Sequence, residues 1–285
     1  MNNLLKSKPK GVATALPAIV WLGLFFFLPL LIVFGVSFLT RGRSGLGTLP
    51  FTFANYTRVF DVFSGIILDS IGIAFVNTVI CLVIGYPLAF WIATRKRQWV
   101  RVAVIFMIIL PFWTNFLVRT YALQTIMARE GIVNSFLINI GAIIEPIQML
   151  NTQGAVLIGL IYGFLPFMVL PIYASVERFD VRYAEAAYDL GANDVSTFWR
   201  VVLPMTMPGV VAGIILVFIP SIGAFVTPDL LGGTNGLMIG TLINTQYKGQ
   251  GNQPLGSALS MVLTGLVMIA LLVYVRFGNQ EEVSS

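Results

Sequence analysis

The sequence predicts an all-α polytopic membrane protein with six transmembrane helices. The mean hydropathy is +0.89, and only 10% of the 285 residues are charged. In addition, three stretches, 11–40, 70–94 and 153–176, contain no charged residue at all. Each is longer than the ~20 residues that a helix needs to cross a hydrocarbon layer of ~30 Å. These runs exclude an ordinary soluble globular protein.

The first apolar run resembles a secretory signal in one respect, because Lys6, Lys8 and Lys10 precede it. Its length is about twice the ~7–15 residues of a signal's apolar region, and no Ala-x-Ala-like site follows it closely. We therefore expect a retained first span. The six predicted spans lie at roughly 13–39, 70–94, 102–126, 153–176, 201–226 and 255–275.

The distribution of basic residues predicts the topology. The connector "RKRQWVR" (95–101) carries four cations in seven residues, which favours a cytoplasmic position. Alternation then places both termini, the 177–200 loop and Arg276 in the cytoplasm. Eleven of the 17 Lys and Arg residues lie inside under this assignment. The net charge of +5 thus reflects topology and does not indicate nucleic-acid binding.

The third span is short. Its charge-free part, 102–118, has only 17 residues and is followed directly by Arg119. Either the span stops at Val118, or it continues to Met127 with Arg119 turned towards protein or water. The longer helix is preferred here, since a charge at that depth seldom faces lipid.

Two external connectors are also expected. The 41–69 segment is punctuated by Gly and Pro and reads as an external loop that caps the bundle. The segment 131–146 is apolar but too short to cross, so it suits an interfacial or half-inserted helix.

The stretch "EAAYDLGANDVSTFWRVVLP" (185–204) has the character of a soluble helical hairpin between two spans. A first helix places charged side chains on one face and small residues on the other. Gly191 is suited to end it, and Asn193 or Asp194 to cap a second helix. The second helix carries an apolar stripe at helical spacing, formed by Val195, Phe198, Trp199 and Val202. A partner's docking surface and ordinary packing on the bundle both fit this pattern.

These residues carry a resemblance. Their spacing is similar to that of the EAA loop of permease subunits from binding-protein-dependent ABC importers. The pattern is Glu-Ala-Ala, three residues, Gly, nine residues, an aliphatic residue, one residue and Leu-Pro. Val201 stands where isoleucine is commonest. The resemblance covers most of the chain and is to the B-type permeases of spermidine/putrescine transporters. It is carried by the stretches "LPFWTNFLVRTYAL", "GLIYGFLPFMVLPIYASVERFD" and "LPMTMPGVVAGIILVFIPSIGAFVTPDLLGG".

The resemblance implies one permease domain over residues 1–285, with the type I ABC importer permease (MetI-like) fold, in the bacterial inner membrane. The 177–200 loop would hold the coupling helix that sits in a groove of a cytoplasmic ATPase subunit. The implied partners are an ATPase dimer, a homologous second permease, an extracytoplasmic binding protein and membrane lipid. The implied coupling residues are Arg182, Glu185, Ala186, Ala187, Asp189 and Gly191.

The chain itself is not expected to be an enzyme or to hold a cofactor. It has no Gly-x-x-x-x-Gly-Lys-Ser/Thr, so ATP and Mg²⁺ would bind the partner ATPase. It also has no His, no metal-ligand cluster and no G-x-S-x-G motif. Candidate substrate-path residues for a polyamine are aromatic or oxygen-bearing: Trp113, Asn115, Tyr121, Phe225 and Asp229.

Two alternatives remain open from the sequence. A related permease for iron, sulfate, thiamine or another amino compound would share the EAA loop and differ in its lining residues. A proton- or ion-coupled secondary transporter would need ionisable residues within the membrane, and only Arg119 approaches that position.

Overall fold

The structure is a computed structural model, and it describes residues 8–248 and 251–278. This part of the chain falls into two compact units. The first contains the residues up to Ser64 together with Leu242–Leu271, and the second contains Gly65–Thr241 and the residues from Leu272 on. The chain ends, for which a cytoplasmic position is predicted, and Lys6 lie outside the described residues.

The first unit opens with a long apolar helical run. Helix α1 (Lys8–Leu22) continues through a π-helical turn, η1 (Gly23–Phe27), into α2 (Leu28–Ser37). Residues 15–37 of this run are long and apolar enough to cross a membrane, in agreement with the first predicted span. The widened turn lies just before Pro29, whose ring would meet a carbonyl of the preceding turn in a regular α-helix.

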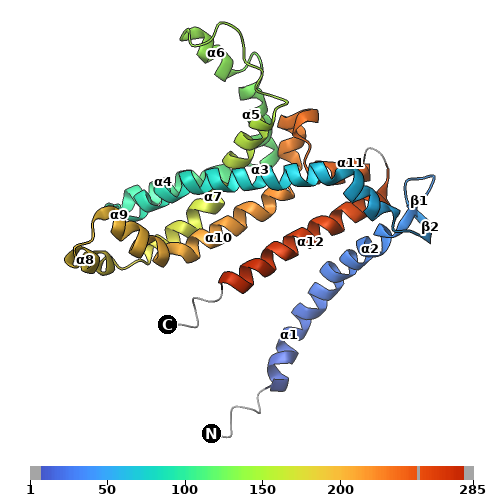
Figure 1. The fold of residues 1–285 in the computed structure, drawn as a ribbon, viewed down its shortest axis with the longest axis horizontal. Helices are drawn as coiled ribbons and strands as arrows, with labels where there is room; N and C mark the ends of the chain where they lie inside the picture. The colour runs from blue at the N-terminus through green and yellow to red at the C-terminus, as the bar shows by residue number, and fades with distance from the viewer. Residues whose placement is uncertain (1–7, 249–250, 279–285) are drawn as a thin grey trace. The chain divides into compact units, whose positions relative to one another are not determined.

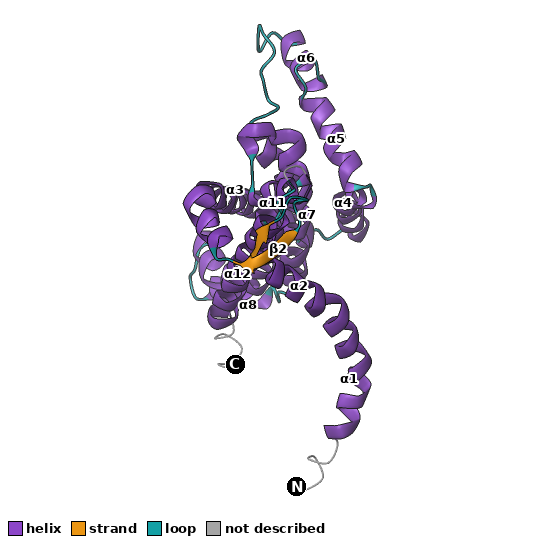
Figure 2. Cartoon of the chain, turned by 90° about the vertical axis from the view of Figure 1, so that its right-hand side faces the viewer, coloured by secondary structure: helices purple, strands orange, loops and turns teal. Residues whose placement is uncertain are grey.

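A small β-hairpin follows, which the sequence did not predict. Strand β1 (Leu39–Arg41) pairs antiparallel with β2 (Gly47–Phe51), as the orange arrows of Figure 2 show. Thr40 reinforces the ladder, because its hydroxyl donates to the carbonyl oxygen of Thr48 at 2.7 Å. The two strands are too few to form a core of their own.

Helix α3 (Ala54–Ala93) starts well before residue 70 and runs for 40 residues. Its first turn is tied to the preceding elements by Asn55, whose amide donates to the carbonyl oxygens of Ser37 at 2.9 Å and Leu39 at 2.8 Å. The expectation of a loop over all of 41–69 is therefore wrong, since the helix begins at Ala54; the external position of the segment before it stays a prediction. Long-range bonds from one side chain stabilise an early helix start that local composition does not reveal.

The chain returns to the first unit through α11 (Ile239–Lys248), a helix that was not predicted, and α12 (Gln253–Gly278). Asn252 joins them: its N–H donates to the carbonyl oxygen of Gln246 at 2.9 Å, and its side-chain oxygen accepts from the N–H of Leu255 at 3.3 Å. Helix α12 contains the last predicted span.

The core of the second unit lies where the C-terminal part of α3 packs with α7 (Gln153–Glu177) and α10 (Leu203–Ile222). In Figure 1, α7 and α10 run alongside each other. Their close approach depends on Gly209, where a Cβ would lie 2.6 Å from the carbonyl oxygen of Pro171. The buried apolar core residues are Cys81, Tyr86, Ala89, Ile92, Met168, Val169, Ile172, Val176, Val210 and Val217.

The third predicted span is broken. Helix α4 (Gln98–Ile109) passes through a 3₁₀ turn, η2 (Leu110–Trp113), before α5 (Phe116–Met127) begins. The two arms meet at 97°. The expectation of one continuous helix over 102–126 is therefore wrong, and Pro111 gives the reason, since it cannot donate to the backbone of the preceding turn.

Helix α6 (Ile132–Asn139) lies within the segment where a short interfacial helix is predicted. Its buried Asn134 donates to the carbonyl oxygen of Ile147 at 2.9 Å and accepts from the N–H of Ile147 at the same distance. One side chain thus closes the irregular segment after α6 back onto the helix. The position of α6 relative to a membrane stays a prediction.

Among the described residues, five helices are long and apolar enough to cross a membrane, and a sixth span results if the bent pair counts as one. The prediction of six spans is confirmed in this form, with a broken third span. A π-helical turn, η4 (Pro228–Gly232), and a 3₁₀ turn, η5 (Gly233–Gly236), lead towards α11. The single domain over residues 1–285 stays a prediction.

Candidate functional site

The predicted hairpin forms after α7 ends at Glu177. The side chain of Asp180 accepts a hydrogen bond from the N–H of Arg182 at 3.0 Å, which satisfies one free donor at the start of α8 (Arg182–Asp189). Helix α9 (Asp194–Thr197) follows and continues through a π-helical turn, η3 (Phe198–Val202), into α10. We call residues 178–202 the coupling hairpin, after the coupling residues that are predicted within it.

The turn between α8 and α9 uses the residues that the sequence indicates. Gly191 has a φ of +85°, a conformation that residues with a Cβ rarely adopt. The N–H of Ala192 donates to the carbonyl oxygen of Ala187 at 3.0 Å, and that of Gly191 to Tyr188 at 2.9 Å, a Schellman motif. Asn193 caps α9 by accepting from the N–H of Ser196 at 2.8 Å.

A side-chain contact also joins the two helices. The side chains of Tyr188 on α8 and Asp194 on α9 interact. Hydrogen bonding of the Tyr188 hydroxyl with Asp194 is the main cause of a raised pKa of Tyr188, above its ordinary value of about 10, and desolvation and the negative charge of Asp194 contribute less. The hairpin is therefore fixed by backbone and side-chain bonds together.

The predicted coupling residues do not all share one environment. Arg182, Glu185, Ala186, Asp189 and Gly191 are exposed. In contrast, Ala187 is half-buried and lines a hollow of about 380 Å³ within the hairpin, as do Gly191 and Arg200. The hairpin also exposes Leu190, at 90% of its maximal area. An exposed apolar tip ringed by charges is typical of a docking surface.

The apolar stripe of the second helix is divided. Phe198 packs against the rings of Tyr86 and Phe90, at centroid distances of 5.6 and 6.5 Å. Val195 and Trp199, however, are exposed by 66% and 62%. The π-helical turn of η3 lies just before Pro204 and changes the helical period, which a stripe drawn at the α-helical spacing does not anticipate.

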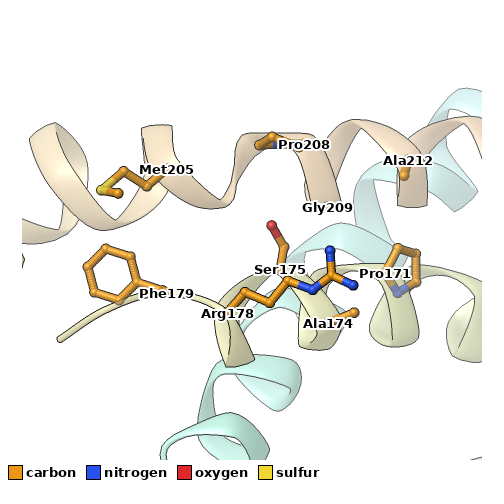
Figure 3. A pocket seen from close by; sticks show the side chains of 9 residues that line it. All are labelled: Pro171, Ala174, Ser175, Arg178, Phe179, Met205, Pro208, Gly209 and Ala212. Carbon is orange, nitrogen blue, oxygen red and sulfur yellow. The ribbon is translucent and has the colours of Figure 1, made fainter. Parts of the chain in front are cut away.

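The hairpin is anchored to the bundle where α7 ends. Arg101, near the start of α4, forms an ion pair with Glu177 and donates to the hydroxyl of Tyr173 at 2.8 Å. Next to this anchor, a hollow of about 470 Å³ opens between α7 and α10. Figure 3 shows the hydroxyl of Ser175 directed towards α10 and the guanidinium of Arg178 lying along α7.

The predicted substrate-path residues are dispersed. Phe225 lines a hollow of about 250 Å³ together with Phe116 and Phe164. Of the other four, Trp113 is 80% exposed and Tyr121 is 53% exposed. Asn115 caps α5 by accepting from the N–H of Leu117 at 2.8 Å, and Asp229 lies exposed in η4. None of these four residues lines that hollow.

Sequence reasoning missed a cluster around Arg119. Its side chain is only 9% exposed, and its guanidinium carbon lies 5.1, 5.3 and 5.6 Å from the ring centroids of Phe112, Phe116 and Tyr162. The i, i+3 spacing of Phe116 and Arg119 is visible in the sequence. Tyr162 belongs to α7, and its approach depends on the bend at η2, which no local pattern shows.

The comparisons with known proteins agree with this arrangement. Residues 85–280 match the family described as binding-protein-dependent transport system inner membrane component. The spermidine/putrescine transport system permease protein PotB of Haemophilus influenzae is 44% identical over 257 residues, 90% of each chain. The inner membrane ABC transporter permease protein YdcU of Escherichia coli is 30% identical, over 91% of this chain and 87% of that protein.

A solved structure shows the same fold. The crystal structure of a bacterial alginate ABC transporter, in complex with an alginate pentasaccharide-bound periplasmic protein, contains a chain that aligns with a TM-score of 0.73 at 17% identity. The alignment covers 94% of this chain and 93% of that chain. The family match spans more than half of the sequence. This chain therefore belongs to the binding-protein-dependent transport system inner membrane components, as a multi-pass permease of the bacterial inner membrane.

Proposed function

We propose that this permease imports polyamines, spermidine or putrescine, driven by ATP hydrolysis on a separate subunit. The observation that carries the proposal is the 44% identity, over 90% of the chain, with permeases named for spermidine/putrescine transport. The hollow lined by Phe116, Phe164 and Phe225 supports it, because aromatic faces attract organic cations. The other candidate path residues, Trp113, Asn115, Tyr121 and Asp229, take part only if the path extends along α5 and η4.

The coupling hairpin is the proposed contact with the ATPase subunit. Glu185 and Ala186 are exposed on α8, so a partner surface can reach them without displacing other residues. Arg182 and Asp189 flank them with charges that can set the orientation of docking. Ala187 and Gly191 have a different role, because they shape the hairpin and its hollow.

The proposed assembly divides the work among chains. The sequence lacks the phosphate-binding Gly-x-x-x-x-Gly-Lys-Ser/Thr, so ATP and Mg²⁺ are assigned to an ATPase dimer and this chain is assigned no catalytic role. A homologous second permease would complete the path as a heterodimer. An extracytoplasmic binding protein would deliver the polyamine, in keeping with the family's dependence on such proteins.

The test is ATPase activity and uptake by the complex of this chain, its second permease, the ATPase and the binding protein in proteoliposomes. We expect stimulation by spermidine or putrescine that depends on the binding protein. Iron, sulfate and thiamine serve as competitors. If the complex ignores polyamines and responds to one of these solutes, the polyamine assignment is wrong and the importer assignment stands.

The docking assignment is tested by Ala186→Glu, which puts a charge on an exposed part of α8 without filling the hairpin's own hollow. We expect assembled complex but at least a tenfold loss of polyamine-stimulated hydrolysis and uptake. The matched control is Ala142→Glu, at an exposed alanine in the segment after α6. Equal loss in both variants, or no loss in Ala186→Glu, would contradict the assignment.

A further inference from the structure

Arg119 is a buried cation whose surroundings are aromatic. Three ring centroids lie 5.1 to 5.6 Å from its guanidinium carbon, within the range of cation–π attraction. One guanidinium nitrogen donates to the carbonyl oxygen of Pro111 at 3.4 Å. We call the rings of Phe112, Phe116 and Tyr162 the aromatic cage.

No ion pair joins Arg119 to a carboxylate within the described part of the chain. A buried charge without an ionic partner is costly unless other groups compensate it. The rings supply that compensation, because their negative faces attract a cation without taking a proton from it. The cage therefore has the composition of a receptor for an organic cation.

The break in the third span builds the cage. Phe112 lies in η2 before the bend, Phe116 begins α5 after it, and Tyr162 comes from α7. The 97° angle between the arms brings rings from both sides of the break to one guanidinium. A change in this angle would open the cage, so its affinity for a cation depends on the conformation of the span.

The cage also adjoins an aromatic hollow. Phe116 is common to both, since its ring faces Arg119 and also lines the hollow of about 250 Å³ that contains Phe164 and Phe225. A flexible cation in the hollow would thus lie one ring away from the cage.

We propose that the aromatic cage is a transient binding site for the ammonium groups of the transported cation, and that Arg119 occupies it in the present conformation. The proposal rests on the polyamine function and adds the site. Arg119 then acts as an internal competitor: it fills the cage when cargo is absent and keeps affinity low enough for release. When an ammonium group of the cargo replaces the Arg119 guanidinium, the charge within the cage stays the same.

The test is equilibrium binding of radiolabelled spermidine to the detergent-solubilised complex of both permeases and the ATPase, without the binding protein. Replacing Arg119 by glutamine empties the cage of its charge. We expect Arg119→Gln to bind spermidine at least tenfold more tightly than the unchanged complex, a ratio that one desolvated cation–π contact can supply. Arg119→Lys retains a cation and should bind as the unchanged complex does.

The gain must also require the rings. Tyr162→Leu combined with Arg119→Gln should remove it, whereas Arg129→Gln, at an exposed arginine after α5, should produce no gain. Unchanged binding in Arg119→Gln would overturn the proposal. So would a gain that survives in the double variant, or a gain of equal size in Arg119→Lys.

A second measurement does not depend on the folding of any Arg119 variant. With Arg119 retained, uptake of spermidine delivered by the binding protein should fall about fivefold in Tyr162→Leu at limiting spermidine and stay near normal in Tyr162→Phe, which keeps the ring. Equal uptake in both variants would overturn the cage. Failure of the proposed polyamine function can be told apart from failure of the cage, because the unchanged complex would then transport no spermidine.

Discussion

The coupling hairpin and the broken third span use charge in opposite ways. In the hairpin, Arg182, Glu185 and Asp189 are exposed around an apolar tip, so their charges are available to a partner. In the broken span, Arg119 is buried among rings of its own chain. An arginine side chain is thus exposed to solvent in one region and enclosed by aromatic rings in the other. Burial and neighbours, rather than residue type, decide the role.

Charge reversal in both regions tests this contrast most strongly. Arg119→Glu places a carboxylate against the negative faces of three rings and should cost roughly 3–5 kcal/mol. We expect the Tm of the solubilised complex to fall by about 10 °C. Arg182→Glu, at an exposed site, should shift Tm by less than about 2 °C and instead weaken association with the ATPase. A similar fall in Tm for both variants would remove the distinction.

The next effect concerns the backbone of the hairpin. Gly191→Val forces a β-branched residue into a φ of +85°, at a cost of roughly 1–2 kcal/mol. No neighbouring atom lies within 4 Å of a Cβ at this position, so the cost is conformational rather than steric. Polyamine-stimulated ATPase activity should fall about tenfold in Gly191→Val and much less in Gly191→Asn, since Asn tolerates this conformation. Equal losses would point to a steric contact with the partner.

Helix caps allow the same substitution in each region. Asn115 caps α5 and Asn193 caps α9, each through its side-chain oxygen. Replacement of either by Ala should cost about 1 kcal/mol, measurable by thermal unfolding. Asn115→Ser should restore the cap. If spermidine uptake also recovers in Asn115→Ser, the residue acts through α5; if uptake stays low, Asn115 contacts the substrate through its amide.

The smallest effect is the titration of Tyr188. Its raised pKa means that the interaction with Asp194 stabilises the hairpin while the Tyr188 hydroxyl keeps its proton, and that this stabilisation is lost as pH rises through the raised pKa. Tyrosinate absorbance should show that Tyr188→Phe lacks a component titrating above the ordinary tyrosine range. Tyr183→Phe, at an exposed tyrosine of the same helix, should retain it. Loss of that component in Tyr183→Phe would show that its assignment to Tyr188 is wrong.

The two regions also differ in how far the sequence predicts them. The hairpin follows from local chemistry: Gly191 takes a left-handed conformation and Asn193 caps the next helix, as their residue types indicate. The broken span does not follow from local chemistry, because an apolar run that contains Pro111 can form either one kinked helix or two helices that meet at a sharp angle. The angle is settled by tertiary contacts, among them Arg119 with Tyr162 of another helix.

The same distinction holds elsewhere. Composition predicts the helical class and the apolar spans, since membrane-length runs have few other uses. The early start of α3 depends on Asn55 and carbonyl groups of an earlier segment, so residue spacing alone could not place it. The six predicted coupling residues could be named from a motif, but the half-buried position of Ala187 beside five exposed residues required the structure.

The helical run from Asp194 to Ile222, formed by α9, η3 and α10, has a mechanical consequence. Its 29 residues, at ~1.5 Å each, form a rod roughly 43 Å long. A tilt of about 5° at the hairpin end would displace the other end by roughly 4 Å. That far end leads directly into Gly223–Phe225 and the hollow beside the aromatic cage. Small angular changes imposed at the hairpin would then produce displacements as large as a substrate ammonium group at the far end of the run.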